Sequence, residues 1–363
     1  MYLSPKFKYN LSRILPFGIL FMLVGWLFLL TEVIATRNIK TSQSEVIEVT
    51  FNIFIFSSVA VFLFGLFIGF LEIIVFKNLF KREGFRKKLL YKFLLYVFFF
   101  LITMLLTYPM AAAIEMESNI LSEAVFSRFI EFLFSVTFFN TLFQLSFSLF
   151  IALIYSSVSE NIGHSVLINF FTGRYAKPRE EIRIFMFLDM KSSTSIAEKL
   201  GNIDYFNFLK DYYEVFSEPI IEHRGEVYEY IGDEIVITWP YDKGIHNAEC
   251  VDCFFAMKNA LKSQQDYFDH KYGNVPDFKA ALHLGRVTIG EIGALKKEIT
   301  FSGDLMNTTS RIQDMCSELK TDLIISRDLY LLIQRNEKYH FVSKGEFNLK
   351  GKQKIIGLYG LED

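Results

Sequence analysis

Two aspartates, a polar turn and an amide–guanidinium pair are the residues of this sequence whose types and spacing suit phosphate chemistry. The first aspartate, Asp189, follows an apolar run, 184–188, and precedes a polar turn and a helix-like segment, 195–200. Such a turn presents unpaired N–H groups to an anion, and the helix dipole favours negative charge at the same place. An ordinary strand-to-helix turn with a solvated aspartate is the alternative for this stretch alone. The expected phosphate-binding residues are Met190, Lys191, Ser192, Ser193 and Thr194.

The second aspartate lies forty-four residues further on, where apolar residues flank Gly232 and Asp233. This pattern predicts a hairpin tip with an exposed carboxylate. Two carboxylates brought together bind divalent cations against phosphate oxygens. Asn307 and Arg311 are four residues apart and share one face if their segment is helical. Acids, phosphate turn, amide and guanidinium are the parts that a nucleotide-transfer site requires.

Five segments carrying these residues resemble the class III adenylate/guanylate cyclases. They occur in family order and at family-like spacing over about residues 180–363, and the first half of the chain carries no such resemblance. The resemblance implies an α+β, ferredoxin-like catalytic domain. The segments are FLDMKSST at Phe187–Thr194, GDE at Gly232–Glu234, LHLGRVTIGEIG at Leu282–Gly293, FSGDLMNTTSR at Phe301–Arg311 and NLKGK at Asn348–Lys352.

The resemblance also implies a role for each matching residue. Asp189 and Asp233 would hold two divalent metals, Mg²⁺ or Mn²⁺, while Asn307 orients the ribose and Arg311 stabilises charge on the α-phosphate. Lys350 matches a lysine that contacts the triphosphate. In the family, the metal acids come from one domain and the Asn/Arg pair from another. Because this chain has a single catalytic domain with both sets, it is expected to form a homodimer with two equivalent sites.

The base-selecting positions depart from the adenylate pattern. Adenylate cyclases of the family usually have a lysine four residues before the second metal aspartate, where this chain has Glu229. An ionised glutamate only accepts hydrogen bonds, which suits guanine N1–H and N2–H₂. The partner position is Thr300, which appears in many bacterial adenylate cyclases and can donate or accept. We favour ATP as the substrate, with GTP as the alternative because of Glu229.

The composition indicates a membrane protein with a soluble half. Hydrophobic residues make up 52% of the 363 residues, with 41 Phe, and the net charge of −2 gives no bulk attraction to nucleic acid. Four apolar runs are long enough to cross a bilayer, and we interpret the first as a retained anchor rather than a signal peptide. Buried helices of a soluble protein are the disfavoured alternative. The runs are approximately 14–34, 51–76, 89–113 and 129–158.

The loop charges predict that both termini are cytoplasmic, in an inner-membrane protein. The N-terminus and the second loop are basic, whereas the first loop is balanced and the third is acidic, and basic segments stay inside. Glu72 and Glu131 lie within or near the runs, where they are either interfacial or sensory. The basic residues are Lys6, Lys8 and Arg13 at the N-terminus, and Lys77, Lys81, Arg82, Arg86, Lys87, Lys88 and Lys92 in the second loop.

We expect three parts: a four-helix transmembrane domain (1–158), a coupling segment (159–181) and a catalytic domain (182–363). At the position of the coupling segment the resemblance implies a transducing element, and a passive linker is the alternative. Pro178 ends any helix there. Cys250 and Cys253 form a lone C-x-x-C in a helix-like run, which we interpret as ordinary helix positions rather than a metal or redox site.

The soluble half alternates strand-like and helix-like segments. Its order is that of an α+β or α/β domain around a mixed sheet. The expected strands are 182–188, hairpin 226–231/234–239, hairpin 278–284/286–292 around Gly285, 322–325 and pairs within 339–361; the expected helices are 203–223, 246–272 and 305–318.

Three classes of function compete for this sequence. The first is a membrane-anchored nucleotidyl cyclase, a phosphorus–oxygen lyase acting in signal transduction. The second is an inactive receptor module that keeps the cyclase fold, which the competent residues at the catalytic positions disfavour. The third is a channel or transporter with a regulatory domain, and the membrane runs lack the charged pathway and broken-helix pairs of that class.

Overall fold

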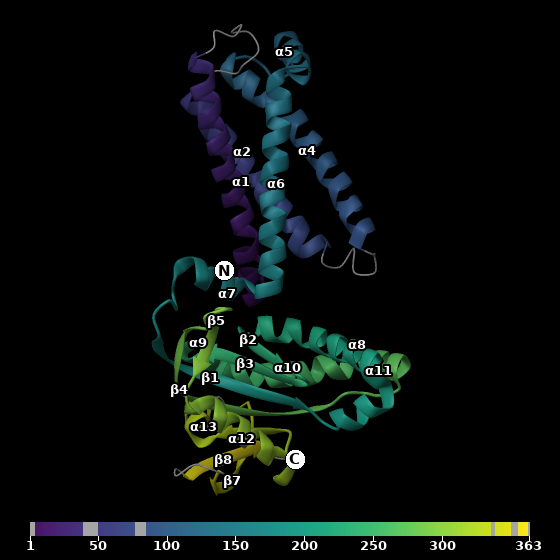
Figure 1. The fold of residues 1–363 in the computed structure, drawn as a ribbon, viewed down its shortest axis with the longest axis vertical. Helices are drawn as coiled ribbons and strands as arrows, with labels where there is room; N and C mark the ends of the chain where they lie inside the picture. Colours follow the sequence, from purple (N-terminus) through teal and green to yellow (C-terminus); the bar gives the residue numbers. More distant parts are fainter. Residues whose placement is uncertain (1–3, 39–49, 77–84, 335–337, 350–354, 362–363) are drawn as a thin grey trace. The chain divides into compact units, whose positions relative to one another are not determined.

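The computed structural model describes residues 4–38, 50–76, 85–334, 338–349 and 355–361 (Figure 1). The chain divides into two compact units, one of which is formed mainly by Lys8–Ile168 and the other mainly by Asn169–Asp363. The first is entirely helical in its described residues, and the second is an α+β unit built on a mixed sheet. Each unit is described by itself.

Four helices of the first unit are apolar and long enough to cross a membrane: Pro5–Thr31, Phe51–Val75, Leu90–Glu115 and Phe138–Ile162. The predicted fourth run, 129–158, is wrong at its start. The helix ends there and a new helix begins, because Ser135 accepts a hydrogen bond from the N–H of Phe138 and so caps α6. The helices are α1 (Pro5–Asn38), α2 (Phe51–Phe70) continuing into the π-helix η1 (Leu71–Val75), α4 (Phe85–Glu115), α5 (Glu123–Leu133), α6 (Val136–Ile162) and α7 (His164–Thr172).

Close helix contacts and a buried ionic cluster around Glu72 characterise this unit. A Cβ at Gly65 of α2 would lie 2.7 Å from the carbonyl oxygen of Phe17, so α1 and α2 approach closely through the missing side chain. Glu72, in η1, is 4% exposed and accepts from Lys92 Nζ and Tyr96 Oη of α4, both at 2.5 Å. The glutamate is thus paired inside the helix bundle, whereas Glu131 is exposed.

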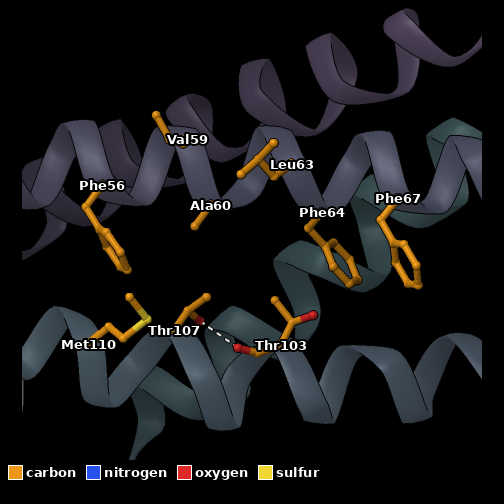
Figure 2. Close-up of a pocket in the computed structure, with 9 residues that line it drawn as sticks. All are labelled: Phe56, Val59, Ala60, Leu63, Phe64, Phe67, Thr103, Thr107 and Met110. Atoms are coloured by element: carbon orange, nitrogen blue, oxygen red, sulfur yellow. Dashed lines mark hydrogen bonds between the residues drawn. The ribbon is translucent and has the colours of Figure 1, made fainter. Parts of the chain in front are cut away.

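A groove of about 350 Å³ lies between α2 and α4 (Figure 2). Its lining is apolar except for two threonines, Thr103 and Thr107, whose hydroxyls donate to the carbonyls of Phe99 and Thr103 in their own helix at 2.9 Å. Because both hydroxyl protons are used within α4, the lining presents mainly apolar surface such as Phe56 and Leu63.

The second unit is organised around a sheet of order β2-β3-β1-β4-β6-β8-β7, with β5 paired to β4. The first four strands and the helices between them follow the order β-α-β-β-α-β with β1 central, which is the expected ferredoxin-like arrangement. Among the strands that the structure describes, β4 and β6 pair in parallel and the other neighbours pair antiparallel. The strands are β1 (Arg179–Met190), β2 (Glu226–Ile231), β3 (Glu234–Pro240), β4 (Phe278–Ile292), β5 (Glu298–Ser302), β6 (Leu323–Ser326), β7 (Phe341–Asn348) and β8 (Ile355–Leu361).

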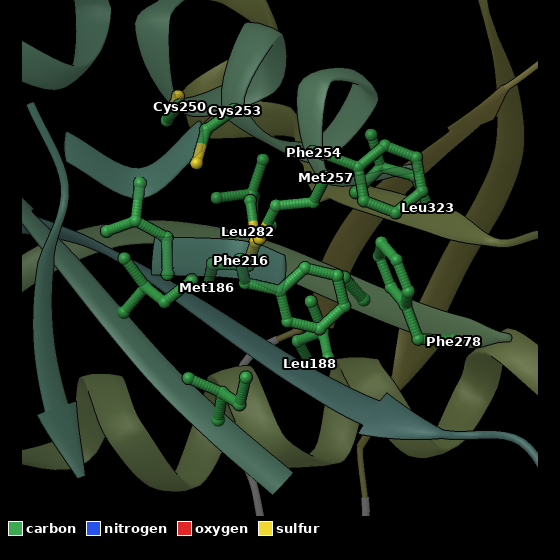
Figure 3. Packing of buried hydrophobic residues seen from close by; sticks show 14 of the residues in the cluster. Met186, Leu188, Phe216, Cys250, Cys253, Phe254, Met257, Phe278, Leu282 and Leu323 are labelled. Carbon is green, nitrogen blue, oxygen red and sulfur yellow. The ribbon is translucent and has the colours of Figure 1, made fainter. Parts of the chain in front are cut away.

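Helices cover both faces of this sheet (Figure 1). On one face, alternate β1 side chains such as Met186 and Leu188 pack with Phe216 and Phe254 in a fully buried core (Figure 3). On the other face, Phe185 packs in a smaller cluster with the first turn of α12. The helices are α8 (Ser193–Glu222), α9 (Tyr241–Ile245), the 3₁₀ turn η2 (His246–Ala248), α10 (Glu249–Ser263), α11 (Gln265–Tyr272), α12 (Asp304–Glu318) and α13 (Arg327–Ile333).

Two sequence predictions in this unit are wrong. The expected hairpin around Gly285 is one continuous strand, β4, because Gly285 provides room for a helix instead of a turn. A Cβ there would lie 3.0 Å from Leu305 Cδ1 of α12. The expected helix 246–272 is divided at Gln264 into α10 and α11.

Cys250 and Cys253 lie on α10 as free, fully buried thiols. Burial raises the pKa of both thiols, so they occupy ordinary core positions of this helix.

Candidate active site

The two predicted metal acids lie together at one end of the sheet. Asp189 is the penultimate residue of β1, and its partner in the antiparallel pairing with β3 is Glu234. Asp233 precedes Glu234 at the tip of the β2–β3 hairpin, which turns through Gly232 at φ 62°. Burial and the nearby Asp233 carboxylate raise the pKa of Asp189. Two half-buried carboxylates that repel each other form a site where a cation would relieve the repulsion.

The residues at this end fit a divalent cation that also binds substrate phosphate. No group of three or more His, Cys, Asp or Glu within the described ranges converges as a closed metal cluster. A site of two carboxylates leaves the other ligand positions to phosphate oxygens and water, which is how Mg²⁺ is usually bound. The donor set of Asp189 and Asp233 therefore suits a metal that arrives with a nucleotide.

The predicted phosphate turn follows directly, but only part of it has free donors. The N–H of Lys191 donates to the Asp277 carbonyl at 2.8 Å, and its ammonium pairs with the carboxylates of Asp277 and Asp322. Met190 belongs to the paired end of β1. Ser192 has a left-handed backbone, φ 57°, and α8 begins at Ser193. Since the first N–H groups of a helix have no intrahelical acceptor, the available donors are those from Ser192 to Thr194.

Two charged residues that the sequence analysis did not single out also lie here. Glu234 is crowded by the two aspartates, and burial first, then their charges, raise its pKa to about 7. Lys279 of β4 is paired in register with Asp189, and its Nζ is 3.6 Å from Asp189 Oδ2. Only the strand register reveals Lys279, whereas the adjacency of Glu234 to Asp233 was visible in the sequence.

The Asn307–Arg311 pair lies on α12, as predicted, but on its outer side. Gln313 of the same helix is 4% exposed and faces the sheet, where its amide opposes the rise in the pKa of Asp189. Arg311 is two residues away, or about 200° around a helix at about 100° per residue. Asn307 is exposed. Within one chain, therefore, Arg311 is attached to α12 on the side opposite to Gln313.

The two predicted base-selecting residues are carried by β2 and β5. Glu229 is exposed and follows a bulge in the β2–β3 pairing. Thr300 is paired with Gly290 of β4. Tyr228, next to Glu229, and Phe301, next to Thr300, are in contact, with their ring centroids 4.8 Å apart. Lys350 falls outside the described residues.

The fold and this site define a class of protein: an α+β domain of ferredoxin-like order with paired acids of the kind that metal-dependent nucleotide enzymes use. Comparison with known proteins identifies the family of this domain. Residues 174–362 match the family described as the adenylate and guanylate cyclase catalytic domain. The chain belongs to this family, which confirms both the resemblance and the fold expected from it.

Adenylate cyclases are among the similar proteins. "Adenylate cyclase 2" of Rhizobium meliloti is 34% identical over 204 residues, which cover 56% of each protein. "Adenylate cyclase" of Anabaena cylindrica is 27% identical over 182 residues, covering 48% of this chain and 35% of that protein. The chain thus spans about half or less of the length of these curated relatives. A bacterial light-regulated adenylyl cyclase shares the fold, with a TM-score of 0.52, 18% identity and coverage of 62% of this chain and 64% of that one.

Proposed function

We propose that this chain is a membrane-anchored nucleotidyl cyclase that converts a purine nucleoside triphosphate, in the first place ATP, into the 3′,5′-cyclic nucleotide and pyrophosphate. The observation that carries the proposal is the pairing of Asp189 with Asp233 beside the turn that opens α8. The names of the relatives support ATP. GTP is the second candidate, because Glu229 supplies an acceptor that suits the guanine edge.

In the proposed reaction the ribose 3′-oxygen attacks the α-phosphorus, and the bond to the β-phosphate oxygen breaks. Asp189 and Asp233 would hold two divalent ions, Mg²⁺ or Mn²⁺, which when bound lower the pKa of the attacking hydroxyl and neutralise the leaving phosphates. The N–H groups from Ser192 to Thr194 would receive the outer phosphates at the start of α8. Lys350 would contact the triphosphate.

Asn307 and Arg311 would act on the nucleotide from a second copy of the chain. In this arrangement Asn307 orients the ribose, and Arg311 stabilises charge that develops on the α-phosphate. The position of Arg311 on α12, opposite to Gln313, supports a site built from the acids of one protomer and the Asn/Arg pair of its partner. A homodimer then has two equivalent sites.

The remaining expectations concern the membrane half. We propose that 1–158 forms a four-helix membrane domain with both termini cytoplasmic, and that 159–181 couples it to the catalytic domain, 182–363. The four apolar helices support a membrane location. The basic second loop supports the orientation in a bacterial inner membrane.

The test is the assay of purified full-length chain with ATP and with GTP, in Mg²⁺ and in Mn²⁺. Asp189→Ala and Asp233→Ala are each expected to abolish cyclic nucleotide formation while the protein remains folded. Asp266→Ala is the control, since Asp266 is an exposed acid on α11. Full activity of either site variant at saturating Mn²⁺ would remove that acid from the site, and inactivity of the parent with both nucleotides would contradict the proposal.

A further inference from the structure

The proposed base-selecting residues lie on strands that are not paired with each other. Glu229 is on β2, at one edge of the sheet, and Thr300 is on β5, which is paired with β4 among the described strands. Strands β3, β1 and β4 separate them in the hydrogen-bonded order. Backbone pairing therefore does not fix the distance between two side chains that must read one purine, and side-chain contacts across the face of the sheet have to do so.

A single buried guanidinium supplies such a contact. Arg183, on the central strand β1, is 4% exposed. Its Nη1 donates to Glu226 Oε2 of β2 at 3.1 Å, three residues before Glu229. Its guanidinium carbon lies 5.1 Å from the ring centroid of Phe301, the residue next to Thr300 on β5. One side chain therefore contacts both strands that carry the base-selecting residues.

Aromatic contacts complete the connection between the same strands. The ring of Tyr228, next to Glu229, meets the Phe301 ring edge-to-face at 4.8 Å, with an angle of 87° between the rings. Phe185 of β1 packs beneath, 5.2 Å from Phe301. The rings bury apolar surface and favour a defined edge-to-face geometry, and the guanidinium of Arg183 over Phe301 adds a desolvated cation–π contact.

The residue type matters at position 183. Arg183 Nε donates to Glu181 Oε2 at 3.0 Å while Nη1 reaches Glu226, so the two carboxylates are bound by different nitrogens of one planar group. A lysine ammonium carries its charge at one point and cannot bind both carboxylates while stacking on a ring. The geometry therefore uses the fork and the flat face of arginine together.

We propose that Arg183 is a positioning residue for purine recognition, which holds β2 and β5 at the separation that lets Glu229 and Thr300 face one base. The inference rests on the proposed function, because it takes these two residues as the base readers. Arg183 itself touches no nucleotide in this scheme. It acts through Glu226 and Phe301.

The ion pair between Arg183 and Glu181 is also connected to Tyr175, in the segment that precedes β1. Glu181, besides binding Arg183, accepts from the Tyr175 hydroxyl at 3.2 Å. Tyr175 is 3% exposed and its carbonyl accepts from the N–H of Glu291 on β4 at 3.2 Å. The substitution Tyr175→Phe removes only this hydroxyl, so it should loosen Glu181 while the aromatic ring continues to pack in the buried cluster with Phe185. This variant is therefore a milder perturbation of the same positioning.

The experiment compares Arg183→Lys and Phe301→Leu with the parent in the full-length protein. Arg286→Lys is the matched control, because Arg286 lies on β4 with its side chain 78% exposed in a loose pair with Glu180. Steady-state rates with ATP and GTP give kcat and KM for each. Competition of both nucleotides against a fluorescent nucleotide analogue reports base selection without turnover.

Both variants are expected to reduce the ratio of kcat/KM between preferred and disfavoured nucleotide by about three- to tenfold, the scale of weakening one desolvated cation–π contact. The change should appear mainly in KM and in the competition ratio, with kcat within about threefold, because the catalytic groups are untouched. Tyr175→Phe should shift the ratio in the same direction by less, and Arg286→Lys should not shift it.

Several outcomes would overturn the inference. Thermal unfolding shows whether Arg183→Lys and Phe301→Leu are folded. If both are folded and the kcat/KM ratio of the two nucleotides stays within about twofold of the parent, Arg183 has only a structural role. If Arg183→Lys does not fold, Phe301→Leu and Tyr175→Phe decide the question by the same ratio. A parent that binds nucleotides without cyclising them contradicts the proposed activity and leaves the binding comparison decisive. A parent that does neither overturns both proposals.

Discussion

The position of Arg311 on α12 leads to a quantitative prediction for mixed dimers. Gln313 faces Asp189 of its own chain, and Arg311 lies about 200° away around the helix. If each site combines the acids of one protomer with the Arg311 of its partner, Asp189→Ala and Arg311→Ala damage different halves of a site. A mixed dimer then contains one site with both lesions and one intact site.

The magnitude follows from this geometry. Loss of a group that stabilises transition-state charge costs about 10²–10³ in kcat, so Arg311→Ala alone should retain about 1% of activity or less. Asp189→Ala should be lower still. When both variants are co-expressed equally and pair at random, about half of the dimers are mixed and half of their sites are intact. The mixture should recover roughly one quarter of parental activity.

The assay is cyclic nucleotide formation by tandem-tagged, co-purified mixed dimers and by the unselected mixture. Selection for the mixed species should raise the recovery to roughly one half. The control pairs Asp189→Ala with Asp233→Ala. Both lesions then fall in the same half of the site, every mixed dimer lacks an acid at each site, and no recovery is expected. Recovery below about 1% in proven Asp189→Ala/Arg311→Ala dimers would refute a shared site.

Three further predictions concern the base, the pH dependence and the membrane orientation. Glu229→Lys should shift the ATP-to-GTP ratio of kcat/KM toward ATP by roughly ten- to a hundredfold, because it replaces an acceptor for guanine N1–H by a donor suited to adenine N1; a change within twofold would show that Glu229 points away from the base. The pKa of Glu234 is raised to about 7 from its usual 4.5, so its contribution to stability is complete below pH 4.5 and is lost as the pH rises through 7. Glu234→Gln should therefore raise Tm relative to the parent at pH 8 and change it little at pH 5. With a chelator present to remove divalent ions, and with allowance for the partial exposure of Glu234, the increase at pH 8 should be about 2–4 °C. An equal shift of Tm at both pH values would contradict this. A cysteine placed at Thr41 should react with an impermeant maleimide on intact cells and one at Lys87 should not, and the reverse pattern would overturn the proposed topology.

Much of the catalytic unit was predictable because its elements are local. The hairpin tip at Gly232 and the helix carrying Asn307 follow from residues within a few positions of each other. The break before α6 was missed because a serine in a largely apolar region is not distinctive in the sequence, and the capping bond that Ser135 accepts from the Phe138 N–H depends on backbone geometry. Gly285 was misassigned because a glycine required for a helix above a strand looks the same in sequence as a glycine required for a turn.

The sequence by itself determined the family, the order of the catalytic segments and the presence of four helices apolar enough for a membrane, since these depend on residue types and spacing along the chain. Only the tertiary structure decided which side chains meet. Strand register brings Lys279 to Asp189, chain folding makes Arg183 a contact to both β2 and β5, and the rotation of α12 places Arg311 on the side of the helix opposite to Gln313. These facts depend on contacts between residues that are 43 or more positions apart in the sequence, which no local pattern encodes.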